Sequence, residues 1–99
     1  MAAVSPVVNV YRALGDLYRQ VGLSLLAEER YLKAVTLAEA AGDAEALATA
    51  QAGLGEVYVT LGRKDEAVRR FEQARAGYES LGDAQHASQV TERLAELKP

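Results

Sequence analysis

The chain has 99 residues, which suits one small domain, and its 11 basic and 14 acidic side chains give a net charge of −3. Because cysteine is absent, disulfides, thiolate metal sites and a cysteine nucleophile are excluded. The mild acidity, without a basic cluster, argues against a nucleic-acid partner. No apolar run approaches the roughly 18 residues of a membrane helix, and no signal peptide is recognisable. We therefore expect a cytoplasmic protein that contacts no membrane.

The composition favours helices throughout the chain. Prolines occur only at Pro6 and Pro99, and alanine, leucine, glutamate and arginine, which favour helices, are abundant. Glycines that can end helices recur at regular intervals, at Gly22, Gly42, Gly62 and Gly82. The sequence therefore predicts five helices, over about residues 6–21, 24–41, 43–61, 64–81 and 84–97. Since the connections are so short, consecutive helices must run antiparallel.

The first two helices carry different patterns. The first has a stripe of valines and leucines at helical spacing, namely Val7, Val10, Leu14, Leu17 and Val21. At this spacing the five side chains lie on one face of the helix. The second has small residues around one aromatic ring, namely Ala27, Tyr31, Ala34 and Ala38. Alanine at a crossing point lets two helix backbones approach, while the ring fills the space one turn away.

The later helices repeat these two patterns. Asp43 and Asp83 stand where the third and fifth helices begin, and aspartate is a favoured N-cap. The third helix has the stripe Leu47, Leu54, Tyr58 and Leu61, and the fifth has Val90, Leu94 and Leu97. The fourth has the small-and-aromatic pattern, with Ala67, Phe71, Ala74 and Tyr78.

The chain thus repeats itself with an offset of 40 residues. The offset matches Leu14-Gly15 with Leu54-Gly55, Tyr18 with Tyr58, Ala27 with Ala67, Tyr31 with Phe71, and Ala34 with Ala74. Gly15 and Gly55 lie inside helices, where glycine costs about 1 kcal/mol relative to alanine. Their recurrence predicts close helix crossings that leave no room for a side chain.

These residues carry a family resemblance. The pattern Tyr11, Leu14, Gly15, Tyr18, Ala27, Tyr31 and Ala34, with its second copy, resembles the tetratricopeptide repeat. The match covers about residues 8–98 and is similar to a variety longer than the usual period of about 34. One departure is Gln51, where the family favours an aromatic residue and the first copy has Tyr11.

The resemblance implies an all-α fold, in which antiparallel helix hairpins form a right-handed superhelix, or α–α solenoid. The single domain, residues 1–99, would hold one repeat over about 8–42 and a second over about 48–82. A C-terminal capping helix would follow over about 84–97. We expect two repeats and one cap to share a single core.

The resemblance further implies a concave groove, lined by the first helix of each repeat, which in this family commonly holds peptides or partner helices. The groove positions would be Asn9, Arg12, Asp16 and Arg19, then Thr49, Ala52, Glu56 and Val59, and then Gln89, Glu92, Arg93 and Glu96. The acidic line Asp16, Glu56 and Glu96 would favour a partner that offers lysine or arginine. The alternative is an ordinary solvated helix face.

Some family members hold the acidic C-terminal tails of heat-shock chaperones with a five-residue carboxylate clamp. The matching positions here are Arg12, Asp16, Gly53, Gln89 and Arg93. Since Asp16 would repel a carboxylate and Gly53 offers no side chain, we expect no binding of chaperone tails.

The second helix also differs from the fourth on its outer side. Leu25, Leu26, Leu32 and Val35 are replaced forty residues later by Asp65, Glu66, Glu72 and Arg75. A cluster of exposed leucines favours contact with another chain. We expect a homodimer through the surface Val4, Val7, Val8, Leu25, Leu26, Leu32 and Val35. The alternatives are that the N-terminal segment covers these leucines, or that they are scattered surface residues.

No pattern in the sequence indicates catalysis. His86 is the only histidine, HExxH and phosphate-loop motifs are absent, and Gly53-Leu54-Gly55 lies within a predicted helix. The sequence therefore predicts no enzyme and no catalytic, cofactor-binding or metal-binding residues. It predicts a scaffold that binds a protein or peptide. The alternative is a regulatory or sensor segment of a larger signalling or transcriptional regulator.

Overall fold

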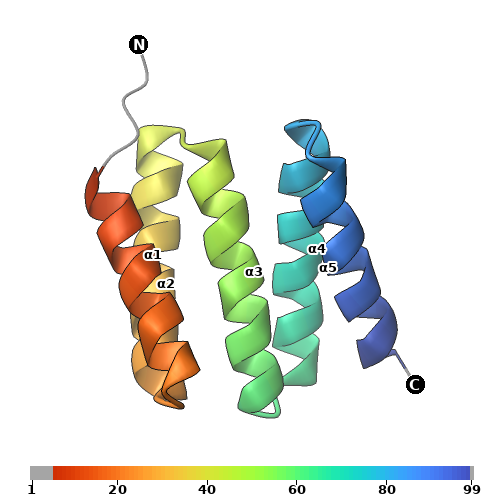
Figure 1. Cartoon of the computed structure of the whole chain (residues 1–99), viewed down its shortest axis with the longest axis horizontal. Coiled ribbons are helices and arrows are strands. Elements are labelled where there is room, and N and C mark those ends of the chain that lie inside the picture. The colour runs from red at the N-terminus through yellow and green to blue at the C-terminus, as the bar shows by residue number, and fades with distance from the viewer. Residues whose placement is uncertain (1–5, 99) are drawn as a thin grey trace.

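The structure, a computed structural model, describes residues 6–98 as five helices that stand side by side (Figure 1). They are α1 (Pro6–Gln20), α2 (Ser24–Ala41), α3 (Ala44–Thr60), α4 (Lys64–Ser80) and α5 (Ala84–Leu97). No strand occurs in this part of the chain. The prediction of an all-α helical repeat fold is confirmed, and each helix begins and ends within one residue of its predicted bounds.

The helix boundaries follow from the local sequence. Each connection contains a glycine with φ between 67° and 84°, a left-handed conformation that side chains disfavour, namely Gly22, Gly42, Gly62 and Gly82. The carboxylates of Asp43 and Asp83 accept hydrogen bonds from the backbone N–H groups of Ala46 at 3.0 Å and His86 at 3.1 Å. These two predicted caps are confirmed, and the short turns fold the chain into antiparallel hairpins.

The core lies between consecutive helices, with α1 and α5 at opposite ends of the row (Figure 1). α3 packs against both α2 and α4, whereas α5 packs mainly on α4. As predicted, α2 contributes small side chains around one large ring, and α4 contributes small side chains with two. They are almost completely buried, namely Ala27, Tyr31, Ala34, Ala38, Ala67, Phe71, Ala74 and Tyr78.

Two aromatic rings occupy notches that glycines leave open. A Cβ atom on Gly15 would lie 2.7 Å from the ring of Tyr31, and one on Gly53 would lie 2.5 Å from it. A Cβ atom on Gly55 would lie 2.7 Å from the ring of Phe71. The predicted close crossings at Gly15 and Gly55 are therefore confirmed, and the rings set the distance between neighbouring helices.

The apolar stripe of the first helix does not face the core. α1 buries Val8 and Gly15 instead, on the side that packs against α2. Four of the five stripe residues expose more than half of their surface, namely Val7, Val10, Leu17 and Val21. The physical reason is that α1 stands at the end of the row, so within residues 6–98 no helix covers its outer side.

Candidate functional site

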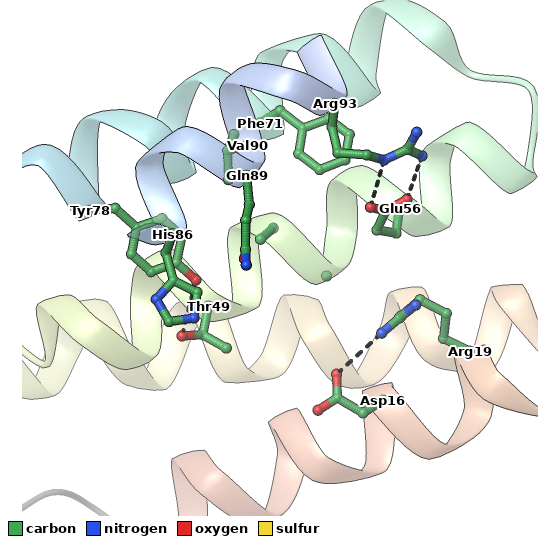
Figure 2. A pocket seen from close by; sticks show the side chains of 12 residues that line it. Asp16, Arg19, Thr49, Glu56, Phe71, Tyr78, His86, Gln89, Val90 and Arg93 are labelled. Carbon is green, nitrogen blue, oxygen red and sulfur yellow. Dashed lines mark hydrogen bonds and ion pairs between the residues drawn. The ribbon is translucent and has the colours of Figure 1, made fainter. Parts of the chain in front are cut away.

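A hollow of about 270 Å³ opens between α1, α3 and α5 (Figure 2). Seven of the twelve predicted groove residues line it, namely Asp16, Arg19, Thr49, Ala52, Glu56, Gln89 and Arg93. Five further residues also line it, namely Gly53, Phe71, Tyr78, His86 and Val90. The hollow therefore has a floor of small and apolar groups and walls of polar and charged side chains.

The other predicted groove residues lie elsewhere. Asn9 and Arg12 line a neighbouring hollow of about 260 Å³, which Thr49 shares. Val59 is half-buried and packs against the core, whereas Glu92 and Glu96 are exposed and line neither hollow. The lined groove is therefore smaller than the predicted face, because five of the predicted residues do not line it.

At the α1 side of the groove, the carboxylate of Asp16 is held by several donors. The buried hydroxyl of Tyr31 donates to one of its oxygens, and Arg12 Nη1 contacts the other at 2.8 Å. Arg19 Nε donates to the hydroxyl of Tyr31 at 3.2 Å, and its guanidinium lies 4.0 Å from Asp16. Burial, with the hydrogen bond to Asp16, raises the pKa of Tyr31 to about 12. Asp16 is therefore well supplied with partners.

On the opposite side, Glu56 and Arg93 form a two-pronged ion pair. Arg93 Nε and Nη2 donate to the carboxylate of Glu56 at 2.8 and 2.6 Å, a geometry that favours arginine over lysine (Figure 2). The same guanidinium lies 3.3 Å from Glu96 and 5.8 Å above the ring of Phe71. The hydrogen bond to Glu56 raises the pKa of Arg93 above its ordinary value.

The predicted acidic line is therefore not a row of free charges. Each of its members, Asp16, Glu56 and Glu96, has an arginine within 3.3 Å. Since Arg12 and Arg93 already neutralise these carboxylates, the groove presents a mixed surface of paired charges.

The end of the groove near the α2–α3 and α4–α5 turns is formed by two stacked rings. The rings of Tyr78 and His86 are 5.0 Å apart and inclined by 22°, and the Tyr78 hydroxyl donates to Thr49 at 3.3 Å. His86 Nδ1 lies 2.7 Å from the carboxylate of Asp83, whose pKa is lowered chiefly by the backbone N–H of His86. His86 was not among the predicted groove residues, although its spacing to Gln89 and Arg93 places it on the same face of α5.

The predicted self-association surface requires a correction. Val8 is completely buried and Val35 is 7% exposed, so assigning these two residues to an outer surface is wrong. Val8 lies on the face of α1 that packs against α2, and Val35 follows Tyr31 by one turn on the buried face of α2. Leu32 is half-buried against the core, whereas Val7, Leu25 and Leu26 are exposed. Val4 lies outside the described residues.

No group of three or more side chains within residues 6–98 is arranged to hold a metal ion. None of the described helices combines the length and the apolar character that crossing a membrane requires.

Comparison with known proteins agrees with the geometry. The family model of the tetratricopeptide repeat matches residues 6–80, which span α1 to α4. No curated protein and no solved structure matches the chain significantly. The matched segment contains both hairpins in which an aromatic ring fills a glycine notch. The chain therefore belongs to the tetratricopeptide repeat family.

Proposed function

We propose that this chain is a non-catalytic interaction module that holds an extended segment of a partner protein between α1, α3 and α5. Tetratricopeptide repeats generally mediate contacts between proteins. The observation that carries the proposal is the hollow of about 270 Å³, which combines an apolar floor with hydrogen-bonding walls. Such a combination suits one anchoring side chain of a peptide and the backbone on either side of it.

The paired charges favour a particular kind of segment. Ala52, Gly53 and Val90 offer apolar surface, while Thr49 and Gln89 offer groups for the backbone of a peptide. A segment with one apolar side chain between uncharged residues would bind without separating the existing ion pairs. An acidic tail would have to compete with Asp16 and Glu56 for Arg12 and Arg93, which supports the expectation that chaperone tails do not bind.

The proposal is tested with peptides selected from a random display library on the immobilised full chain. Ala52→Arg would fill the hollow with a long side chain, and Ala76→Arg makes the same change on the exposed face of α4. We expect Ala52→Arg to weaken binding of a selected peptide by about tenfold or more, measured by fluorescence anisotropy. Ala76→Arg should bind as the unchanged chain does. Failure to select any peptide, or equal binding by both variants, would contradict the proposal.

We further propose that the chain self-associates through its α1 end. Eight large apolar side chains are strongly exposed in the described part of the chain, and seven of them lie between Val7 and Leu26. The eighth is Leu81. At the other end of the row, α5 exposes mainly polar residues, among them Gln85, Gln89, Glu92 and Glu96. A gathering of apolar surface at one end is typical of a contact with another protein.

A further inference from the structure

A row of apolar side chains runs along α1, and no described helix covers it. The row, called the α1 seam below, consists of Val7, Val10, Leu14, Leu17 and Val21. Leu14 is half-buried, and the other four expose more than half of their surface. Their spacing alternates between three and four residues, which is the spacing that lets two helices pack along a common line.

The internal repeat shows what such a row does when a helix covers it. The equivalent positions of α3 are Leu47, Ala50, Leu54, Val57 and Leu61, and those of α5 are Ala87, Val90, Leu94 and Leu97. All of them are buried or pack, partly buried, against the core. α5 packs mainly on α4, the helix before it, and α3 packs on α2 and α4. The α1 seam is thus a helix-binding surface whose helix does not come from residues 6–98.

The α1 seam is suited to packing against the same seam of a second copy of the chain. Its positions are nearly symmetric about Leu14: Val7 and Val21 lie seven residues to either side, while Val10 lies four residues before it and Leu17 three residues after it. Two antiparallel α1 helices that cross at Leu14 would set Val7 of one copy against Val21 of the other. The antiparallel arrangement also brings together opposite ends of the two helix dipoles. We infer that the α1 seams of two copies dock on each other as a two-fold pair; this rests on the self-association proposed above and names its surface.

The distribution of charge on α1 also favours a second copy of the chain as the partner of the seam. The residues that flank the seam carry no charge, namely Pro6, Ala13 and Gln20 on one side and Tyr11 and Tyr18 on the other. The charged residues Asp16 and Arg19 of α1 line the groove instead (Figure 2). Two approaching seams therefore bring no like charges together. A head-to-tail contact would place the polar side of α5 on the seam, which disfavours open filaments and favours a closed pair.

The size of the contact indicates a weak, reversible dimer. Complete burial of a valine or leucine side chain removes on the order of 100 Å² from water, and these side chains are already about half covered. A contact that covers the seam and also Leu23, Leu25 and Leu26, which are exposed around the start of α2, would then bury about 400 Å² per copy. Interfaces of this size are smaller than those of stable complexes and are typical of weak, transient contacts. We therefore expect a dissociation constant in the micromolar range.

The test is sedimentation velocity of the full chain from about 1 to about 500 µM, a range that brackets a weak interface. Val10→Glu with Leu17→Glu places two charges in the seam and should weaken the dimer by about a hundredfold. Ser88→Glu with Ala95→Glu adds the same charges at the same spacing on the exposed side of α5 and should leave it unchanged. Circular dichroism checks that both variants are folded.

The outcomes separate the two claims. A chain that stays monomeric at every concentration would contradict both the proposed self-association and the inferred docking through the α1 seam. A dimer that persists in the seam variant would contradict only the docking through the α1 seam. The chain would then self-associate through another surface. A dimer that both double variants weaken equally would also overturn the seam, because net charge would then explain the loss.

The absence of cysteine from the sequence allows a second measurement. Leu14→Cys places a single thiol at the inferred crossing point, and Ala76→Cys places one on the exposed side of α4. With oxidised glutathione as the oxidant, we expect Leu14→Cys to form a disulfide-linked dimer at least about tenfold faster than Ala76→Cys. The thiolate of one copy must reach the mixed disulfide of the other and release reduced glutathione. Equal rates would overturn the two-fold pairing at Leu14.

Discussion

Tyr31 and Phe71 occupy the same position in the two repeats, but the groove uses them differently. The hydroxyl of Tyr31 donates to Asp16. Phe71 has no hydroxyl, and Glu56, which stands at the position equivalent to Asp16, receives its hydrogen bonds from Arg93 instead. A carboxylate at this groove position therefore receives a strong donor, which either the ring or the following helix can supply.

The two rings are also held with different tightness. Tyr31 lies between Gly15 of α1 and Gly53 of α3, so that both neighbouring helices press on it. Phe71 meets Gly55 of α3, but the residue of α5 equivalent to Gly53 is Arg93, whose side chain lies over the ring. The first ring is clamped between two backbones, whereas the second has one flexible neighbour.

The largest expected loss of stability comes from adding a methyl group at Gly53, against the ring of Tyr31. Gly53→Ala would bring a Cβ atom to 2.5 Å from Tyr31, which cannot retreat because Gly15 lies on its other side. We expect the free energy of unfolding to fall by about 3 kcal/mol in urea titrations. Gly55→Ala should cost about 1 to 2 kcal/mol, since Phe71 can move toward the side chain of Arg93.

Gly77→Ala is the control for these two substitutions. Its Cβ atom would lie 3.1 Å from Ala48, and alanine is the better helix former, so the net change should stay below about 1 kcal/mol. Equal losses for Gly53→Ala and Gly55→Ala would show that the two rings are clamped alike.

The helices and close crossings could be predicted from the sequence because they depend on local properties. A glycine such as Gly55 inside a helix has a cost that only packing offsets, and Gly62 after a helix allows a turn that other residues resist. The outward direction of Val10 could not be predicted in this way. Its periodicity matches that of buried Ala50, and only the absence of a covering helix within residues 6–98 distinguishes them.

The groove could be predicted only in part, because its contacts join residues that are far apart in the sequence. Helix periodicity places Asp16 and Glu56 on the groove side, but the partner that each carboxylate finds depends on contacts far apart in the sequence. Arg93 lies 37 residues from Glu56. Tyr78 was predicted as a packing residue of α4, and its stacking on His86 requires the placement of α5 relative to α4. Such contacts follow only once the helices are assembled.

A smaller effect is expected from the tyrosine hydroxyls, which should make the stability of the fold fall at alkaline pH. Because folding raises the pKa of Tyr31 from 10 to about 12, folding favours its neutral hydroxyl. That contribution is complete below pH 10 and is lost as the pH rises toward 12, by about 2 kcal/mol for this group. Tyr58, whose hydroxyl donates to Glu28, has a pKa raised to about 12 by burial and contributes in the same window.

The measurement is the free energy of unfolding in urea at pH 9 to about 12, for the unchanged chain and for Tyr31→Phe. At neutral pH, Tyr31→Phe should cost about 1 kcal/mol, because the hydrogen bond to Asp16 is lost. Above pH 10 its stability should fall less steeply than that of the unchanged chain. Tyr58→Phe should reduce the same alkaline loss, because Tyr58 contributes in the same pH window, and an alkaline loss that neither substitution reduces would contradict the assignment.

The smallest effect is expected at the ion pair that replaces the tyrosine hydroxyl in the second repeat. Arg93→Ala leaves Glu56 without its donors, but about a third of each side chain is exposed, so water can take over part of the interaction. We expect a loss of about 1 kcal/mol in low salt, and less in 1 M salt.

Arg93→Lys keeps the charge but cannot form two parallel hydrogen bonds, and it should fall between Arg93→Ala and the unchanged chain. A loss that is equal for alanine and lysine would mean that the paired geometry, and not the charge, stabilises this side of the groove. If neither substitution lowers the stability, the carboxylate of Glu56 is satisfied by water alone. The need for a donor would then hold only for Asp16, whose partner Tyr31 is fully buried.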